Sequence, residues 1–199
     1  MDQLGGVYVI NLDRRTDRLA EITGELDRMG IPFKRFAGID RKPGILGCGL
    51  SHLAVLKEAK SLGLKNVLIF EDDFTFLVEK DDFWKKIAAF FETQDFFDVC
   101  MLGYNIQEAR PHNSLLMKVL EAQTASAYIV NQSFYDPLIT LYEEAMPLLE
   151  NTGYHWIYAN DQVWKRLQPG ANWFAFKERI GRQRPSWSDN SEAFMDHGV

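Results

Sequence analysis

Three consecutive carboxylates, Glu71, Asp72 and Asp73, directly follow the apolar segment 67–70. Adjacent like charges raise one another's pKa and disfavour the compact state unless a cation or solvent screens them. Oxygen-rich, sulfur-free groups suit hard divalent cations such as Mg²⁺ or Mn²⁺, with a substrate phosphate completing the coordination shell. The triplet therefore indicates a metal site for a phosphate-bearing substrate. For these residues alone, the alternative is an exposed turn after a strand.

A second group of interest is the arginine cluster Arg14, Arg15 and Arg18. It lies at the expected start of a helix, where backbone amides and guanidinium groups both favour a phosphate or a nucleotide. The alternative is a solvated helix face, on which Asp17 and Glu21 are ordinary ion-pair partners. The phosphate-binding interpretation is strengthened because the cluster is expected at the same sheet edge as the triplet.

The sequence gives little support for a P-loop, a dinucleotide-binding motif, a cysteine-based metal site or a nucleophilic pair. There is no GxxxxGK[ST] loop, and the GCG at 47–49 belongs to no GxGxxG run. Cys48 and Cys100 form no CxxC pattern and show no metal-ligand spacing with the four histidines. Ser51 and His52 are neighbours on an expected helix, so they should point in different directions and not form a nucleophilic pair.

The segments that must position these groups alternate between strand and helix patterns. Leu19, Ile22, Leu26 and Met29 fall on one helical stripe, and Gly30 is a suitable stop. We expect strands at 7–12, 33–40, 67–70, 97–102, 125–130 and 172–176. We expect helices at 14–29, 50–62, 81–93, 155–168 and from about 131 to 150, with Pro137 in the first turn of the last.

This alternation predicts βαβ units and a largely parallel sheet, with ligands at the carboxyl ends of the strands. The region 103–114 is expected to be irregular. No composition shift marks a linker, so we expect a single domain over 1–199, with 177–199 as a C-terminal lid or tail.

Composition and charge limit the class of protein. The 46% hydrophobic and 13% aromatic content is that of a folded globular protein. The net charge of −6 argues against non-specific nucleic-acid binding, which relies on a basic surface. No apolar run approaches the roughly 18 residues of a membrane span, and no signal peptide is recognisable. We therefore expect a cytoplasmic protein without a nucleic-acid partner or a membrane span.

Three segments in a fixed order carry a family resemblance: VYVINLDRRTDRL at 7–19, GCGLSHLAVLKEA at 47–59 and VLIFEDD at 67–73. Together they resemble glycosyltransferase family 25, which includes bacterial lipooligosaccharide galactosyltransferases and collagen β-galactosyltransferases. The later segments DVCMLGYN, TASAYIV and NDQVW look like further parts of the family. The short length and the IGRQRPSWSDN ending suggest a minimal member from a bacterium or a virus, which would act in the bacterial or infected host cytoplasm.

The resemblance implies a GT-A fold, a single Rossmann-like α/β domain that binds a nucleotide sugar on a mostly parallel sheet flanked by helices. It also implies a UDP-sugar donor, a divalent cation, Mn²⁺ or Mg²⁺, and inversion at the anomeric carbon. The triplet matches the DxD-like element of the family, which makes Asp73 the expected metal ligand and places Glu71 and Asp72 at the donor.

Further site residues follow by matching positions. Asn11, Leu12, Arg14 and Arg18 match the first signature and would lie around the uridine or its diphosphate. Gly47, Ser51 and His52 match the second signature and are assigned to the architecture of the nucleotide site. For this second set the alternative is loop and helix packing.

Glycosyl transfer by single displacement needs a base for the proton of the acceptor hydroxyl and positive charge on the leaving diphosphate. Asp161, in NDQVW, is the expected base, and a helix N-cap or a surface acid is the alternative. In the tail, Arg182, Arg184, Ser186 and Ser188 offer donors to phosphate, and Asp189 or His197 could complete a metal shell. A mobile terminus is the alternative for the tail.

The sequence leaves three functions open. A metal-dependent glycosyltransferase comes first, with galactose, glucose or xylose as the donor sugar and a glycan, lipooligosaccharide or glycoprotein as acceptor. A nucleotide-sugar-binding protein without transfer activity would keep the same donor residues. A metal-dependent phosphohydrolase is the third possibility, but its two-metal site would usually need more clustered carboxylates than this sequence shows. The oligomeric state is open.

Overall fold

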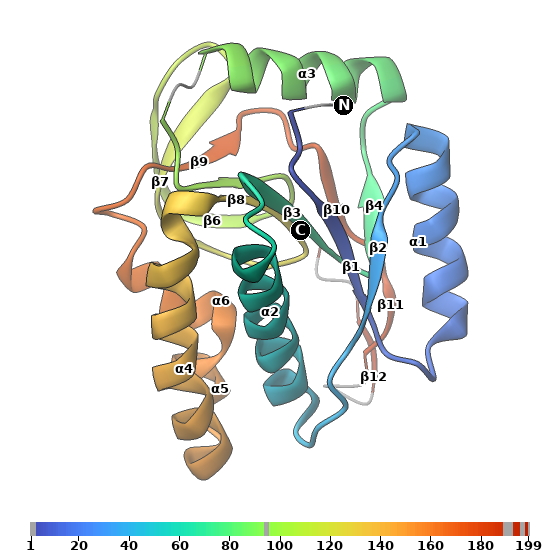
Figure 1. The fold of residues 1–199 in the computed structure, drawn as a ribbon, viewed down its shortest axis with the longest axis vertical. Coiled ribbons are helices and arrows are strands. Elements are labelled where there is room, and N and C mark those ends of the chain that lie inside the picture. Colours follow the sequence, from blue (N-terminus) through green and yellow to red (C-terminus); the bar gives the residue numbers. More distant parts are fainter. Residues whose placement is uncertain (1–2, 94–95, 189–192, 196–197, 199) are drawn as a thin grey trace.

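A computed structural model describes residues 3–93, 96–188, 193–195 and 198 of the protein. Its centre is an eight-stranded sheet with the order β2-β1-β3-β8-β5-β9-β7-β6 (Figure 1). The strands of this sheet are β1 (Val7–Asn11), β2 (Lys34–Ala37), β3 (Asn66–Glu71), β5 (Val99–Met101), β6 (Asn105–Pro111), β7 (Leu116–Gln123), β8 (Ala127–Asn131) and β9 (Trp173–Phe176).

Strand direction in this sheet is mixed. β1 pairs in parallel with β2 and β3, and β5 pairs in parallel with β9. β8 is antiparallel to β3 and β5, and β7 is antiparallel to β9 and β6. Within the described sheet only β7 and β8 are therefore reversed. The expected α/β fold with a mostly parallel central sheet is confirmed.

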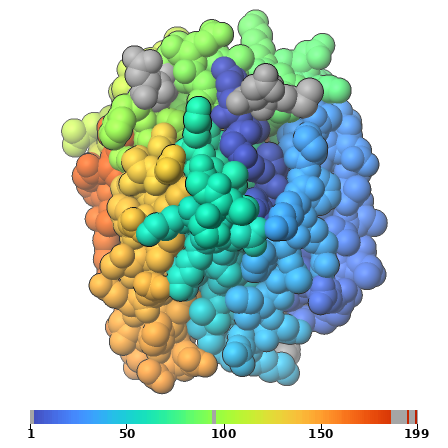
Figure 2. Space-filling model, in the orientation of Figure 1, coloured from blue at the N-terminus to red at the C-terminus, as the bar shows by residue number. Residues whose placement is uncertain are grey.

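Helices cover both faces of the sheet. The helices are α1 (Thr16–Met29), α2 (Gly44–Ser61), α3 (Lys80–Thr93), α4 (Tyr135–Thr152), α5 (His155–Tyr158) and α6 (Asn160–Val163). α1 and α3 pack on one face, and α2, α4 and α6 pack on the other. Figure 2 shows α2 and α4 side by side on the face turned to the viewer.

The core consists of one hydrophobic cluster on each face. Along β3, Val67 and Ile69 join the cluster under α2, whereas Leu68 and Phe70 join the cluster under α1. All four side chains are fully buried, as expected for a strand with helices on both faces. The end of this rigid strand carries the carboxylate triplet, so the core fixes the position of the triplet.

Several element boundaries match the sequence. α1 ends at Gly30, whose φ of 66° is in the left-handed region that favours glycine at a helix end. Pro137 lies in the first turn of α4, where a missing N–H costs little. Strands were expected close to where β1, β2, β3, β5, β8 and β9 lie.

Other expectations are wrong. α2 begins at Gly44 and not near Leu50, because the glycine-rich segment is itself helical. The region 103–114, expected to be irregular, contains β6, and β7 was not anticipated. Pro111 ends β6 at the edge of the sheet, where a proline is tolerated.

The expected helix at 155–168 is broken. It forms α5, α6 and a 3₁₀ turn at Trp164–Arg166, because the backbone at Ala159 is extended, with φ −58° and ψ 151°. β9 is also not the last strand. β10 (Gly181–Gln183) pairs with β4 (Phe74–Phe76), and β11 (Ser186–Ser188) pairs with β12 (Ala193–Met195). The prediction of a single domain over 1–199 stays a prediction.

Across the described ranges, every helix is too short or too polar to cross a lipid bilayer.

Candidate functional site

The carboxylate triplet lies at the connection between β3 and β4, next to the carboxyl end of β1. Asn11, the last residue of β1, donates from Nδ2 to Asp72 Oδ2 at 2.7 Å and to the Arg15 carbonyl at 2.9 Å. Asn11 and Asp72 are both buried. The first strand signature and the triplet therefore meet at one sheet edge, where the sequence placed them.

Arg18 is the arginine that reaches the triplet. Its Nη1 donates to Asp72 Oδ1 at 3.0 Å and to Asp73 Oδ2 at 3.2 Å. All three side chains are largely buried, with exposed fractions of 9–14%. A buried, charge-assisted contact of this kind holds the two carboxylates together. Arg18 thus lies at the sheet edge of the triplet, and its donor-binding role stays a prediction.

The other residues of the first signature lie further out. Arg14 pairs with Asp40 at the surface, and Arg15 pairs with Asp17. The carbonyl of Leu12 accepts a 2.9 Å hydrogen bond from the Arg15 amide, which closes the turn into α1. Arg14 and Leu12 lie near the sheet edge, and their donor-binding roles stay predictions.

Of the three carboxyl groups in the triplet, Asp73 is the one whose ionisation its surroundings disfavour most. Burial raises the pKa of Asp73 to about 7, with a further contribution from the charge of Glu71, against the opposing effect of Arg18. Burial also raises the pKa of Asp72, although Arg18 and Asn11 oppose this. Asp73 Oδ1 is buried and has no hydrogen-bond partner among the described residues. A buried carboxylate oxygen without a partner is suited to ligate a cation.

α2 contributes two neighbouring polar residues that face different partners, as expected. Ser51 Oγ accepts from the Ile39 amide at 2.8 Å and donates to the Gly47 carbonyl at 2.7 Å, so it fastens α2 to the segment after β2. His52 is fully buried, with Nδ1 2.7 Å from Tyr128 Oη and Nε2 3.1 Å from Glu71 Oε1. Ser51 thus anchors α2 and His52 contacts the triplet, while the donor-binding roles of both stay predictions.

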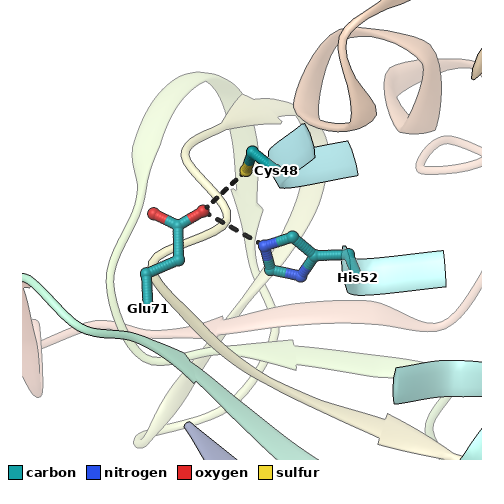
Figure 3. Close-up of side chains that lie close together, drawn as sticks. All are labelled: Cys48, His52 and Glu71. Atoms are coloured by element: carbon teal, nitrogen blue, oxygen red, sulfur yellow. Dashed lines mark hydrogen bonds and ion pairs between the residues drawn. The ribbon is translucent and has the colours of Figure 1, made fainter. Parts of the chain in front are cut away.

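Cys48 is a site residue that sequence reasoning missed. Its thiol donates to Glu71 Oε1 at 3.3 Å, and Figure 3 shows Cys48 and His52 both pointing from α2 toward this carboxylate. Burial alone would raise the pKa of Glu71, but the hydrogen bond and charge of His52 outweigh burial and lower it. The spacing of four residues between Cys48 and His52 on a helix was the available signal.

Asp161, in the first turn of α6, shares this environment. Its Oδ2 accepts from the Thr124 amide at 3.1 Å. Burial raises the pKa of Asp161, and the charge of Glu71 adds to this against the Thr124 hydrogen bond. Thr124 has a φ of 81°, which is a strained conformation for a β-branched residue. Such strain persists only where the surrounding structure holds it, and it is common at functional sites.

The start of the tail lies against the triplet. Gln183 donates to Glu71 Oε2 at 3.4 Å, and the Arg184 amide donates to the Asp73 carbonyl at 2.6 Å. Arg182 pairs in register with Thr75, and its Nε is buried without a hydrogen-bond partner in the described part of the chain. Gln183 was not predicted, because no local pattern points to a contact 112 residues away.

Four predicted tail residues remain without a described side chain. Ser186 and Ser188 lie in β11, for which the structure describes the backbone only. Asp189, the second expected metal ligand, lies outside the described residues, as does His197.

Comparison with known proteins gives one family. The family described as "Glycosyltransferase family 25 (LPS biosynthesis protein)" matches residues 43–154, which include α2 and the triplet. Asn11, Arg18, Asp161 and the tail lie outside this range.

Individual relatives are distant. A glycosyltransferase 25 family member of Anopheles gambiae is 27% identical over 37% of this chain and 17% of its own length. A Rattus norvegicus protein named "Probable inactive glycosyltransferase 25 family member 3" is 27% identical over 61% of this chain and 26% of its own length. The chain thus spans no more than about a quarter of the length of these curated relatives.

One solved structure has a similar fold along nearly the whole chain. It is a glycosyltransferase involved in the glycosylation of the major capsid of PBCV-1, with a TM-score of 0.56 and 9% identity. The similarity covers 94% of this chain and 95% of that one. At this identity the likeness concerns the fold alone.

Proposed function

Because this chain belongs to glycosyltransferase family 25, we propose that it is a metal-dependent, inverting glycosyltransferase. It would move a hexose or pentose, such as galactose, glucose or xylose, from a UDP-sugar to a hydroxyl group of a glycan, lipooligosaccharide or glycoprotein acceptor. The observation that carries this proposal is Asp73 Oδ1, a buried carboxylate oxygen that has no hydrogen-bond partner in the described part of the chain. It lies beside two further carboxylates at the carboxyl end of β3.

The residues at this edge fit a hard divalent cation. Asp73 would hold Mn²⁺ or Mg²⁺ through Oδ1, because oxygen donors suit these ions. The bound cation would supply positive charge for the leaving diphosphate. Asp72 is already held by Asn11 and Arg18, so it would act by keeping Arg18 in place near the phosphates. Asp189 remains a proposed second ligand.

Donor binding would involve the edges of the same crevice. Arg14, at the surface, and Arg182, with its buried Nε, are the further cationic side chains proposed to face the diphosphate. Gln183 and Arg184 bring the tail against the triplet, which supports the proposal that residues 177–199 cover the donor. A cover of this kind excludes water that would otherwise hydrolyse the sugar nucleotide.

Asp161 is the proposed base. In the transfer step the acceptor oxygen would form a bond to C1 of the sugar, and the bond from C1 to the diphosphate oxygen would break. The proton of the acceptor hydroxyl would pass to the Asp161 carboxylate. Burial raises the pKa of Asp161, and a base works best when its pKa approaches the working pH. Its hydrogen bond to the Thr124 amide fixes the carboxylate.

Calorimetric titration with UDP tests the donor site. With Mn²⁺ present the protein should bind UDP in preference to GDP and CMP, and EDTA should abolish binding. Asp73→Asn should weaken Mn²⁺-dependent UDP binding at least about tenfold, because an amide oxygen lacks the carboxylate charge. Asp136→Asn is a matched control, since Asp136 lies at the surface beside Lys60.

The outcomes separate the parts of the proposal. Unchanged UDP affinity in Asp73→Asn would remove Asp73 as a metal ligand. No nucleotide binding under any condition would leave family membership as a statement about fold alone.

A transfer assay with a UDP-sugar panel tests Asp161. Asp161→Asn should bind UDP like the wild type and lose transfer by about 10²- to 10⁴-fold, the usual contribution of a positioned base. The amide oxygen can still accept from Thr124, so the fold should persist. Full transfer activity in this variant would exclude Asp161 as the base.

A second candidate function follows from the name of the rat relative, which describes it as inactive. A protein that binds nucleotide sugars without transfer would show Mn²⁺-dependent UDP binding but no product with any donor or acceptor. Its UDP affinity would be the same in wild type and Asp161→Asn.

A further inference from the structure

We propose that Cys48, His52 and Glu71 form a binding site for a borderline-soft transition-metal ion, with Zn²⁺ as the best match. The site is distinct from the proposed hard-cation site at Asp73, although Glu71 is a neighbour of Asp73 in the triplet. The three ligand atoms, Sγ, Nε2 and Oε1, lie within 4.8 Å of one another (Figure 3).

The spacing of the ligand atoms fits a tetrahedral ion. Glu71 Oε1 lies 3.3 Å from Cys48 Sγ and 3.1 Å from His52 Nε2. Around tetrahedral zinc, ordinary bond lengths place an oxygen about 3.6 Å from a sulfur and about 3.4 Å from a nitrogen. Movements of about 0.3 Å would bring these two distances to the zinc values. Cys48 Sγ and His52 Nε2, which lie within 4.8 Å of each other, would have to come to about 3.6 Å around the ion.

The ligands stand on rigid supports. Cys48 and His52 are four residues apart on α2, which places them on one face of the helix. Glu71 ends β3, whose preceding residues are fully buried. A site held by a long helix and a central strand loses little conformational entropy when an ion binds.

His52 is also oriented from its far side. Its Nδ1 lies 2.7 Å from Tyr128 Oη, and both residues are fully buried. Zinc-ligating histidines commonly hydrogen-bond through the second ring nitrogen, which fixes the ring orientation and the tautomer. With Nδ1–H donated to Tyr128, the Nε2 lone pair would point to the ion.

The surroundings favour a cation of this type. A Cys48 thiolate and the Glu71 carboxylate together would balance the charge of a divalent ion. Asp73 and Asp161 both contribute negative charge at Cys48. Thiolate and imidazole ligands select zinc, cobalt and similar ions over Mg²⁺ and Ca²⁺. The fourth position would be open, since the Glu71 side chain is 19% exposed and water can reach it.

Cobalt is the probe for this site, because a Co²⁺–thiolate bond gives a charge-transfer band in the near ultraviolet and tetrahedral Co²⁺ absorbs strongly in the visible. We would treat the full chain with EDTA, keep it reduced, and titrate it with Co²⁺. The expected result is both bands at one ion per chain. One equivalent of Zn²⁺ should remove them, and a thousandfold excess of Mg²⁺ should not.

Matched variants test whether the charge-transfer band arises from Cys48. The chain has two cysteines, and Cys100 is buried in the cluster under α1. Cys48→Ala should lose the charge-transfer band, whereas Cys100→Ala should keep it. Asp73→Asn should also keep it, although that variant is expected to lose metal-dependent UDP binding. Because the Co²⁺ band depends on Cys48 and metal-dependent UDP binding depends on Asp73, the zinc site and the proposed function can fail independently of each other.

Other results would overturn the proposal. These are absence of the charge-transfer band in the wild type at excess Co²⁺, a band that persists in Cys48→Ala, or a band that Mg²⁺ removes. Far-UV circular dichroism shows whether each variant is folded. If Cys48→Ala does not fold, Cys48→Ser and the displacement of Co²⁺ by Zn²⁺ in the wild type decide the question.

Discussion

Asp72 and Asp73 are neighbours with different environments. Asp72 accepts hydrogen bonds from Asn11 and Arg18, so both of its oxygens are paired. Asp73 receives Arg18 on Oδ2, while Oδ1 is buried without a partner among the described residues. An unpaired buried charge costs several times more than a paired one. Asp73 is therefore the member of the triplet that would gain most from a bound cation.

This difference predicts how stability depends on pH. The pKa of Asp73 is raised from 3.8 to about 7 in the folded protein. Between these values the unfolded chain gives up its proton first, so ionisation of Asp73 lowers the free energy of unfolding as pH rises to about 7. Asparagine does not titrate. At pH 8 in EDTA, the free energy of unfolding of Asp73→Asn should therefore exceed that of the wild type by a few kcal/mol, since one pKa unit is about 1.4 kcal/mol.

Urea unfolding at pH 5 and pH 8 measures this effect. The gain should be smaller at pH 5, where Asp73 of the folded wild type is mostly protonated. Asp136→Asn, at the surface, is the control and should show no gain that grows with pH. A wild type that is the more stable protein at pH 8 would show that Asp73 carries its charge at little cost.

Among the elements, α2 links the site to the rest of the fold. Its second turn lies so close to the segment after β2 that a Cβ on Gly47 would be 2.2 Å from the Ile39 carbonyl oxygen. Ser51 bonds to the same segment, and the next residue, His52, reaches Glu71. The absence of a side chain at position 47 is thus what allows the helix to bring Cys48 and His52 to the triplet.

A pair of glycine substitutions tests this role. Gly47→Ala should lower the free energy of unfolding by about 1–3 kcal/mol, because backbone atoms must move to make room. Gly24→Ala is the matched control. Gly24 is exposed within α1 and nothing lies near its added Cβ, so alanine should raise stability by about 0.5–1 kcal/mol.

Urea denaturation of both variants measures these changes, and their m values show whether the folded states stay equally compact. Equal stability of Gly47→Ala and the wild type would mean that α2 can shift away from Ile39. In that case the bond between His52 and Glu71 should be weakened, and Co²⁺ binding reduced.

For the whole molecule, local patterns predicted the elements better than their arrangement. The apolar stripe of α1 and the buried run of β3 show their type in the sequence, because burial dictates residue type there. The direction of β8 leaves no such trace, since a strand buried on both faces looks the same in either direction. β6 was missed because it is an edge strand with an exposed pattern and weak alternation.

The residues of the candidate site also divide into those that local patterns predict and those whose contacts depend on the complete fold. The meeting of Asn11, Arg18 and the triplet follows from parallel strands with adjacent carboxyl ends, so it was predictable. Gln183 reaches Glu71 only because β10 pairs with β4, a contact that depends on the complete fold. Cys48 could have been found from its spacing to His52, but only if α2 had been expected to begin before residue 48.

The place of β9 has a consequence for biosynthesis. β9 lies between β5 and β7 in the sheet, although it follows both in the chain. While the ribosome is still adding residues before Trp173, β7 and its partner β6 have no strand through which to join β5. The nascent chain therefore exposes the edges of β5 and β7 until residue 176 has emerged, and unpaired edges promote aggregation. Completion of the sheet therefore has to wait for the synthesis of β9.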